Sequence, residues 1–336
     1  MAEIYTTYDQ VGKAEDVSDV ISNIDPFDTP FQTMIGSETC KAINPSWQED
    51  GMADPAAKAA PRVEGGDYAE TARNPTRMRT NFTEIRGDAF KVSETSDAVR
   101  THGRARETAY QLSKTGKEQK VAWEVRLLGH APAAADAVAG TDATAGDEST
   151  TPRTAGNVFG KDASPVPADI LAHRSAATTS QVAFDESAFL QGMQTTYDNG
   201  APGRILMVSP NVSLMIKDWA TLPSGRFRDS GQGKKLTMVV DFLITPFSGN
   251  EGVKVVLNRW MGMNTDGSKH TDDNGNAALL FDPSYWKIMT LRPWRTGPLA
   301  KVGDNHRHYI RGEFTLKHRN YNEGFAWVNL GAPVSG

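Results

Sequence analysis

Cysteine is nearly absent from this chain of 336 residues, which contains a single thiol, Cys40. One cysteine excludes an internal disulfide and any cysteine-rich zinc module, as is typical of proteins in a reducing compartment. We expect Cys40 to be a buried structural thiol rather than a reactive one. Long apolar runs are also absent, because no stretch reaches the roughly 18 consecutive apolar residues of a membrane span, and residues 1–13 lack both a basic start and an apolar signal core. The sequence therefore predicts a soluble, cytoplasmic protein with no membrane segment.

An excess of positive charge is missing as well. The chain has 36 Lys and Arg residues against 41 Asp and Glu residues, which gives a net charge of −5, and both signs are mixed along the sequence. A protein that wraps nucleic acid neutralises many phosphates and needs a basic surface. The composition therefore argues against a nucleic-acid-wrapping protein.

The motifs of common enzyme classes are not found. A phosphate-binding loop fails at Gly233-Lys234, because Lys235 follows where Ser or Thr is required and Arg228 stands in place of the first glycine. No G-x-S-x-G nucleophile elbow occurs, and nothing singles out a general acid/base pair among the carboxylates. We therefore assign no catalytic residue and no cofactor site, and predict that the protein is not an enzyme.

Two polar clusters resemble metal sites without meeting their requirements. In the stretch 272–276, aligning Gly275 with the sixth position of a calcium loop puts His270 first and Phe281 last, where carboxylates are needed. This stretch is expected to be a polar hairpin turn. Three histidines near the C-terminus lack a partner carboxylate or cysteine at ligand spacing and are expected to be solvated strand residues: His306, His308 and His318. No metal ligand is assigned.

The first 92 residues contain too few apolar side chains for a core of their own. A short helix is expected around Val17 to Ile21, followed by an extended arm, because the prolines at 26 and 30 favour extended geometry. The apolar residues of this arm need a surface to lie on, either within their own subunit or on a neighbour. Residues 80–92 contain no proline and predict one strand roughly 40 Å long. The excursion over residues 40–92 is thus either disordered or stabilised by another chain.

The clearest helix spans Arg104 to Gly129 and would be about 39 Å long. Its apolar heptads are not sustained, which disfavours a coiled coil. The low-complexity tract from Ala131 to Thr154 predicts a surface loop.

The remaining chain predicts an α/β region followed by a strand-rich end. Helices at 184–199 and 210–220, with strands at 204–209, 235–244, 253–258 and 277–281, predict one mixed sheet covered by helices. Strands at 285–293, 308–318 and 325–330 predict a β-hairpin and a closing strand.

Several short motifs occur in a fixed order along nearly the whole chain. The first are Glu15-Asp16-Val17-Ser18-Asp19-Val20-Ile21, Asn23-Ile24-Asp25-Pro26 and Asp28-Thr29-Pro30-Phe31. The later ones are Lys91-Val92-Ser93, Ala109-Tyr110-Gln111-Leu112 with Lys114, Gly116 and Lys117, Phe281-Asp282-Pro283 with Tyr285-Trp286, Leu291-Arg292-Pro293, and Leu299-Ala300-Lys301 with Gly303-Asp304. Together their order and spacing resemble the major head (capsid) proteins of tailed bacteriophages.

That family is similar to capsid proteins with the Hong Kong 97-type fold, so the resemblance implies an α+β subunit with the following parts. These are an N-terminal arm (1–39), an extended loop (40–95), a peripheral spine helix (96–130), an axial domain (131–283), a peripheral sheet and loop (284–319), and a C-terminal strand that returns to the axial domain (320–336).

The resemblance also implies a function and partners. Identical subunits would form hexamers and pentamers of an icosahedral head, assembled in the host cytoplasm, that encloses double-stranded DNA without sequence-specific binding. The arm motifs begin almost at Met1, so a separate scaffolding protein is expected, beside a portal protein and a possible decoration protein. Lys58 lies in the extended loop, but no matching asparagine is identified and no crosslink is predicted. Candidate intersubunit ion-pair residues are Arg73, Arg77, Arg79, Arg86, Lys301, Asp304 and Arg307.

Two other readings stay open at this point. An encapsulin-like compartment shares the fold and would contain cargo protein rather than DNA. A soluble α/β enzyme would form a small oligomer and would need a pocket with perturbed titratable groups.

Overall fold

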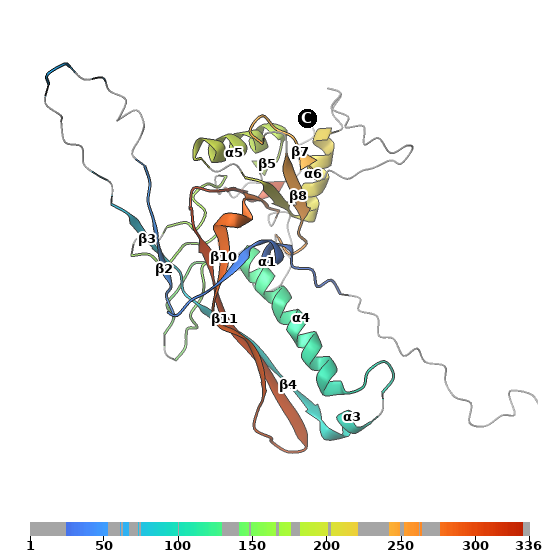
Figure 1. Cartoon of the computed structure of the whole chain (residues 1–336). Helices are drawn as coiled ribbons and strands as arrows, with labels where there is room; N and C mark the ends of the chain where they lie inside the picture. The colour runs from blue at the N-terminus through green and yellow to red at the C-terminus, as the bar shows by residue number, and fades with distance from the viewer. Residues whose placement is uncertain are drawn as a thin grey trace, which may run out of the picture.

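The computed structural model describes most of the chain. The described residues are 25–52, 61, 63–66, 73, 75–99, 101–129, 141–147, 149–165, 168–175, 182–200, 203–220, 242–248, 252–261, 263 and 276–331. They form two lobes, each built around its own sheet, and a hairpin projects from the side of the molecule (Figure 1). No helix in these ranges is long and apolar enough to cross a membrane.

The lower lobe in Figure 1, the peripheral lobe, is a four-stranded sheet with one long helix beside it. The strands lie in the order β1 (Gly36–Thr39), β10 (Trp286–Pro298), β11 (Asn305–His318) and β4 (Glu84–Ser93). β1 pairs with β10 in parallel, and the other pairs are antiparallel. The helix α4 (Glu107–Leu128) has 22 residues and is about 33 Å long. The predicted spine helix and C-terminal hairpin are confirmed.

A short helix, α3 (Glu94–Ala98), connects β4 to the segment before α4. It begins where the Ser93 side chain accepts a hydrogen bond from the Ser96 N–H group at 3.2 Å, which satisfies one of the free amides of the first turn.

The upper lobe, the axial lobe, is a five-stranded mixed sheet. Its strand order is β12 (Phe325–Trp327), β9 (Ala278–Phe281), β6 (Ile205–Val208), β8 (Val253–Leu257) and β7 (Phe242–Leu243). Two helices accompany it, α5 (Glu186–Asp198) and α6 (Pro210–Ala220). A two-stranded sheet pairs β5 (Val182–Ala183) with β13 (Leu330–Gly331). The predicted mixed sheet is confirmed, and β12 from the C-terminal part of the chain lies at its edge.

The two faces of β6 contribute to two different apolar clusters. Leu206 and Val208 pack with Phe189 of α5 and Ile216 of α6 on one face. On the other face, Met207 belongs to a cluster that also contains residues of α4, β10 and β11. Because successive side chains of a strand point to opposite faces, one short strand supports both cores. The second cluster crosses from one lobe to the other, so the lobes share a core.

The predicted extended arm contains a short helix, α1 (Pro30–Met34), which begins with proline at its first turn. Phe31 is fully buried, with its ring centroid 5.4 Å from that of Phe281 and 6.0 Å from that of Trp286. The surface on which this part of the arm lies is therefore the core of its own subunit.

The strand predicted over residues 80–92 is confirmed by β4, but it begins at Glu84, and Thr80 belongs to a separate strand. β3 (Arg77–Thr80) pairs with β2 (Ser46–Glu49) in the projecting hairpin, whereas β4 belongs to the peripheral sheet. Between them, the Asn81 and Thr83 amides donate to the carbonyls of Pro45 and Ile43. The Asn81 side chain donates to the carbonyls of Gly156 and Leu316 at 3.2 and 2.8 Å. These buried bonds hold the chain at the break between the two strands.

Part of the predicted surface loop is described, and it is mostly exposed. Its tip closes on the Asp147 carboxylate, which accepts amide hydrogen bonds from Thr150, Thr151 and Ser149 and whose pKa is lowered by them. The surface loop is confirmed over 141–147 and 149–154. The predicted helix at 17–21, the strand before residue 242, the tract 131–140 and the polar turn at 272–275 lie outside the described residues.

Candidate assembly interfaces

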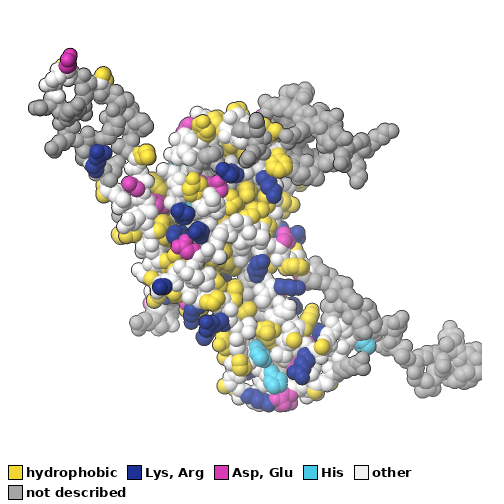
Figure 2. Space-filling view, in the orientation of Figure 1, with side chains coloured by type: hydrophobic (Ala, Val, Ile, Leu, Met, Phe, Trp, Pro, Cys, Tyr) yellow, Lys and Arg dark blue, Asp and Glu magenta, His cyan; other side chains and the backbone are white. Residues whose placement is uncertain are grey.

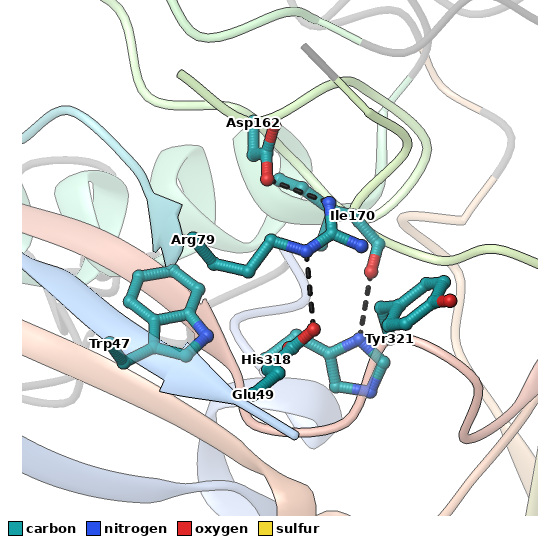
Figure 3. A pocket seen from close by; sticks show the side chains of 7 residues that line it. All are labelled: Trp47, Glu49, Arg79, Asp162, Ile170, His318 and Tyr321. Carbon is teal, nitrogen blue, oxygen red and sulfur yellow. Dashed lines mark hydrogen bonds and ion pairs between the residues drawn. The ribbon is translucent and has the colours of Figure 1, made fainter. Parts of the chain in front are cut away.

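The projecting hairpin is attached to the rest of the subunit by the buried side chain of Arg79 (Figure 3). The Arg79 side chain is 2% exposed; its Nε lies 3.2 Å from a Glu49 oxygen and its Nη1 lies 2.7 Å from an Asp162 oxygen. The guanidinium also lies over the Tyr321 ring, 4.5 Å from the ring centroid. A buried charge is tolerated only with such partners. Arg79 therefore fixes β3 both to β2 and to the loop that contains Asp162.

Asp162 is itself held in place. Its carboxylate accepts hydrogen bonds from the Ser164 hydroxyl at 2.8 Å and from the Ala168 amide at 3.0 Å. The attachment point of the hairpin is therefore a rigid polar cluster and not a pair of mobile surface charges.

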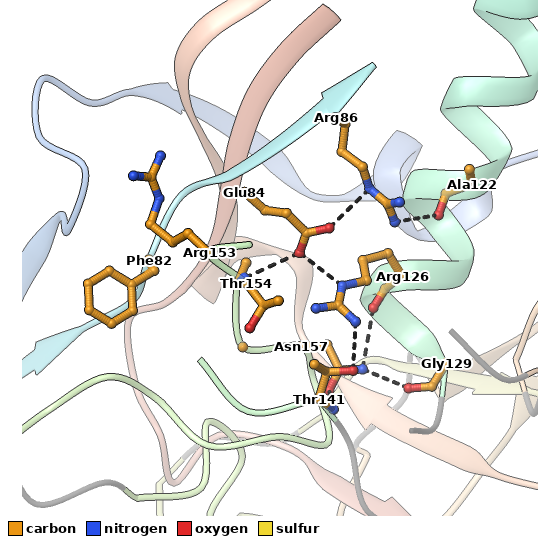
Figure 4. Close-up of polar contacts among 12 residues, drawn as sticks. Phe82, Glu84, Arg86, Ala122, Arg126, Gly129, Thr141, Arg153, Thr154 and Asn157 are labelled. Carbon is orange, nitrogen blue, oxygen red and sulfur yellow. Dashed lines mark hydrogen bonds and ion pairs between the residues drawn. The ribbon is translucent and has the colours of Figure 1, made fainter. Parts of the chain in front are cut away.

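A second buried cluster joins β4 to α4 (Figure 4). The Glu84 carboxylate lies 2.9 Å from Arg126 Nε and 3.2 Å from Arg86 Nε, and it accepts a 3.2 Å hydrogen bond from the Ala155 amide. Arg86 also donates to the carbonyl of Ala122 at 3.4 Å. The first strand after the hairpin is thus fixed to the spine helix by charge-assisted bonds.

Glu313 on β11 forms a third buried contact point. Its carboxylate accepts from the Thr83 hydroxyl at 2.7 Å and from Arg292 Nε at 2.8 Å, and it is also bonded by Arg153. Glu313 was predicted only as part of an alternating strand, and its 3% exposure follows from this loop contact.

The arm is attached through Glu124 of α4, which is fully buried. Its carboxylate accepts from the Phe31 amide at 2.7 Å, the Gln32 amide at 3.0 Å and the Asn258 side chain at 2.8 Å. The free amides at the start of α1 favour a negative charge at this position. Burial raises the pKa of Glu124, although these hydrogen bonds oppose the rise. Arm, spine helix and axial lobe therefore meet at one carboxylate.

The predicted intersubunit residues fall into distinct groups. Arg79 and Arg86 have the intrachain partners described above, so their charges are used inside the subunit. Arg73 and Arg77 are exposed, and the Arg77 guanidinium lies 5.4 Å from the Tyr321 ring centroid. For these two, an intersubunit role stays a prediction.

The other three predicted residues lie at the tip of the peripheral lobe. Lys301 is paired with Glu94 of α3, and Asp304 shares a hydrogen bond with the same carboxyl. The bonds from Lys301 and Asp304 lower the pKa of Glu94. Arg307 is half-buried on β11, and its side chain points to the face of the sheet opposite this cluster. Their intersubunit role also stays a prediction.

A basic face on the peripheral sheet combines the predicted Arg307 with residues that sequence reasoning missed. Ile310 lies next to Gly116 of α4, so its neighbour Arg311 points to the opposite face. There Arg311 is directly opposite Arg295 on β10, and both are exposed. Arg307 on β11 and its partner Lys91 on β4 share this face. In Figure 2, Lys and Arg side chains lie on this lower lobe among apolar, histidine and acidic side chains.

Like charges directly opposite each other on adjacent strands are unfavourable for the isolated sheet. The alternation of Arg311 with buried neighbours was visible in the sequence. Its partner on β10, Arg295, was not, because the β10–β11 register contains irregularities near Arg292.

The histidine and cysteine predictions need correction. His318 is buried, not solvated: its ring stacks on Trp286 at 3.8 Å between centroids and bonds the Ile170 carbonyl and Glu323 at 2.8 and 3.2 Å. Cys40 is half-buried, not fully buried, and burial raises the pKa of its thiol. Among the described residues, no group of three or more His, Cys, Asp or Glu side chains is arranged to hold a metal ion.

Comparisons with known proteins agree with this architecture. The model of the SU10 major capsid protein family matches residues 4–330. The major capsid protein of Escherichia phage Phieco32 is 29% identical over 358 aligned positions, which cover 98% of this chain and 97% of that protein.

Solved capsid structures share the fold at low sequence identity. The capsid asymmetric unit of cyanophage A-1(L) has a TM-score of 0.61 and 13% identity, covering 97% of this chain and 98% of that one. The capsid of a native GTA particle has a TM-score of 0.59, 11% identity and the same coverage. For Gordonia phage Cozz the TM-score is 0.55 with 12% identity, covering 96% and 92%.

The predicted Hong Kong 97-type fold and the predicted function, a major capsid protein of a tailed bacteriophage and thus a structural component of the virion, are confirmed. The chain belongs to the SU10 major capsid protein family.

Proposed function

We propose that this subunit assembles into hexamers and pentamers of a closed icosahedral head that encloses double-stranded DNA. We further propose that the loop beyond the β2–β3 hairpin and the part of the N-terminal arm before α1 lie across neighbouring subunits. Assembly takes place in the host cytoplasm with a separate scaffolding protein and a portal protein, and a decoration protein is a further possible partner. The subunit performs no catalysis.

One observation carries this proposal: the hairpin is rigidly attached at its base and exposed beyond it. Arg79 and Asn81 are buried at the base, whereas Met52 is 101% and Val63 is 84% exposed farther along the loop. In Figure 1 the described piece that contains Val63 lies at the far end of the projection, away from both lobes. Apolar side chains this far from the core of their own subunit are available for burial against another molecule.

The basic face of the peripheral sheet is a fitting partner for this loop. Residues 50–76 contain five acidic residues against three basic ones, and the acidic residues Glu64, Asp67 and Glu70 follow one another without an intervening basic residue. An acidic loop from a neighbouring copy would relieve the repulsion between Arg295 and Arg311. Each such contact is weak, but a closed shell repeats it in every subunit.

A loop-replacement experiment tests the proposal. Residues 51–75 are replaced by a short Gly-Ser turn that keeps β2 and β3, and the variant is expressed with its scaffolding protein. We expect a folded, soluble subunit with the parental melting temperature that forms no shells in electron micrographs. Normal shells from a variant of parental stability would refute the role of the loop.

Charge reversal tests the basic face. Arg295→Glu replaces a like-charge cross-strand pair with an opposite-charge pair, so it should keep or raise subunit stability, by up to about 1 kcal/mol, while it weakens assembly. Combining it with Glu64→Lys, Asp67→Lys and Glu70→Lys should restore shells. If Arg295→Glu assembles as well as the parent, the face is not an intersubunit contact.

A further inference from the structure

A small cavity lies inside the base of the hairpin, between β2, β3 and the segment around Tyr321 (Figure 3). Its volume is about 10 Å³. Three residues that line it carry buried polar atoms for which the described protein groups supply no hydrogen-bond partner: Trp47 Nε1, Glu49 Oε1 and Arg79 Nη2.

The hairpin register places these three residues around the cavity. Trp47 is directly opposite Arg79, and Glu49 is two residues along β2 on the same face as Trp47. The other nitrogens of the Arg79 guanidinium are used by Glu49 and Asp162. The sequence pattern Trp-x-Glu opposite Arg therefore places two N–H donors and one carboxylate acceptor on residues that line a single small cavity.

The chemistry of the wall selects the ligand. A buried polar atom left without a partner destabilises the fold by about 1–3 kcal/mol, so three such atoms at one place indicate a partner that is not part of the chain. A cation would face the Arg79 guanidinium, and an anion would face the Glu49 carboxylate. A neutral molecule that both donates and accepts satisfies all three atoms, and a cavity of about 10–15 Å³ holds one water.

We propose that this cavity is a structural water site, in which one water donates to Glu49 Oε1 and accepts from Trp47 Nε1 and Arg79 Nη2. The water completes the polar cluster that fixes the hairpin to the loop that contains Asp162. The site follows from the subunit alone; its importance for shell geometry rests on the proposed function of the loop.

High-resolution electron cryomicroscopy of the assembled protein, or a crystal structure of the subunit, tests the site directly. We expect a density peak within hydrogen-bond distance of all three atoms. Overturning the proposal requires a map that shows other ordered waters but no peak here, with the Arg79 and Glu49 side chains closing the space.

Hydrogen exchange gives an independent readout. Trp47→Phe keeps an aromatic ring but removes the N–H donor, so the amides of β2 and β3 should exchange roughly tenfold faster, the effect of about 1.4 kcal/mol. Trp294→Phe, on β10 and away from the cavity, is the matched control and should leave these amides unchanged. Equal exchange in Trp47→Phe and the parent would contradict the proposal. The loop-replacement variant keeps the residues that line the cavity. The water site can therefore be confirmed or refuted even if the proposed function of the loop fails its own test.

Discussion

Replacing Arg79 by alanine removes the cation that lies between two buried carboxylates. The side chains of Arg79 and Asp162 are each 2% exposed and that of Glu49 is 9% exposed, so solvent screens these charges little. Breaking a buried ion pair on one side leaves an uncompensated charge and destabilises a protein by about 3–5 kcal/mol. Because domains are stable by only about 5–15 kcal/mol, Arg79→Ala should reduce the free energy of unfolding by a large fraction.

Urea unfolding of the unassembled subunit, followed by tryptophan fluorescence, measures this loss. Arg77→Ala is the matched control, because Arg77 lies two residues away on the same strand, is exposed, and has a side chain that contacts the Tyr321 ring. This substitution should cost about 0.5–1 kcal/mol. Adding Asp162→Asn to Arg79→Ala should recover part of the loss, because one orphaned charge is then removed. If Arg79→Ala and Arg77→Ala lose the same stability, or if Asp162→Asn simply adds to the damage, the buried-anchor reasoning is wrong.

Three further predictions concern the core and the arm. Phe31→Ala should lower the free energy of unfolding by about 3–5 kcal/mol in chemical denaturation, because this buried ring fills the space where the arm meets the core; a loss below 1 kcal/mol would mean that the arm is not anchored there. Burial raises the pKa of Glu124 in the folded state above the unfolded value of about 4.3, so the parent should gain stability relative to Glu124→Gln as the pH falls through the raised value. Urea unfolding at several pH values measures this difference in stability, and a difference that does not change with pH would contradict the prediction. A Cβ on Gly192 would lie 2.1 Å from the Trp327 ring, whereas one on Gly116 in α4 would lie 3.9 Å from its nearest neighbour. In thermal melting, Gly192→Ala should therefore be destabilised by about 1–3 kcal/mol and Gly116→Ala stabilised by about 0.5–1 kcal/mol; the opposite order would refute this packing.

Elements with strong local signals were predictable from the sequence. The spine helix was visible as a long stretch without proline, and α6 as an apolar helix that begins at Pro210. α5 begins where Asp185 accepts a hydrogen bond from the Ala188 amide at 2.8 Å. The apolar residues that indicate this helix are separated by only a few positions in the sequence. These signals are local, because helix periodicity and end residues depend on neighbours in the chain.

The anchoring residues were not predictable, because their partners are distant in the sequence. Arg79 and Asp162 are 83 residues apart, and Asn81 bonds the carbonyl of Leu316 across 235 residues. An arginine in a polar stretch usually stays in solvent, which is why Arg79 and Arg86 were grouped with the exposed charges of the loop. His318 was misread for the same reason: its stacking partner Trp286 lies on the neighbouring strand, and the loops that cover both come from elsewhere in the chain.

The most direct test of the account is an electron cryomicroscopy map of particles assembled from this subunit. The account predicts closed icosahedral shells in which the density of residues 51–75 leaves its own subunit at Arg79 and continues over the peripheral sheet of an adjacent copy, close to Arg295 and Arg311. A map in which that segment folds back onto its own lobes, or a purified protein that stays monomeric when it is expressed with its scaffolding partner, would contradict it.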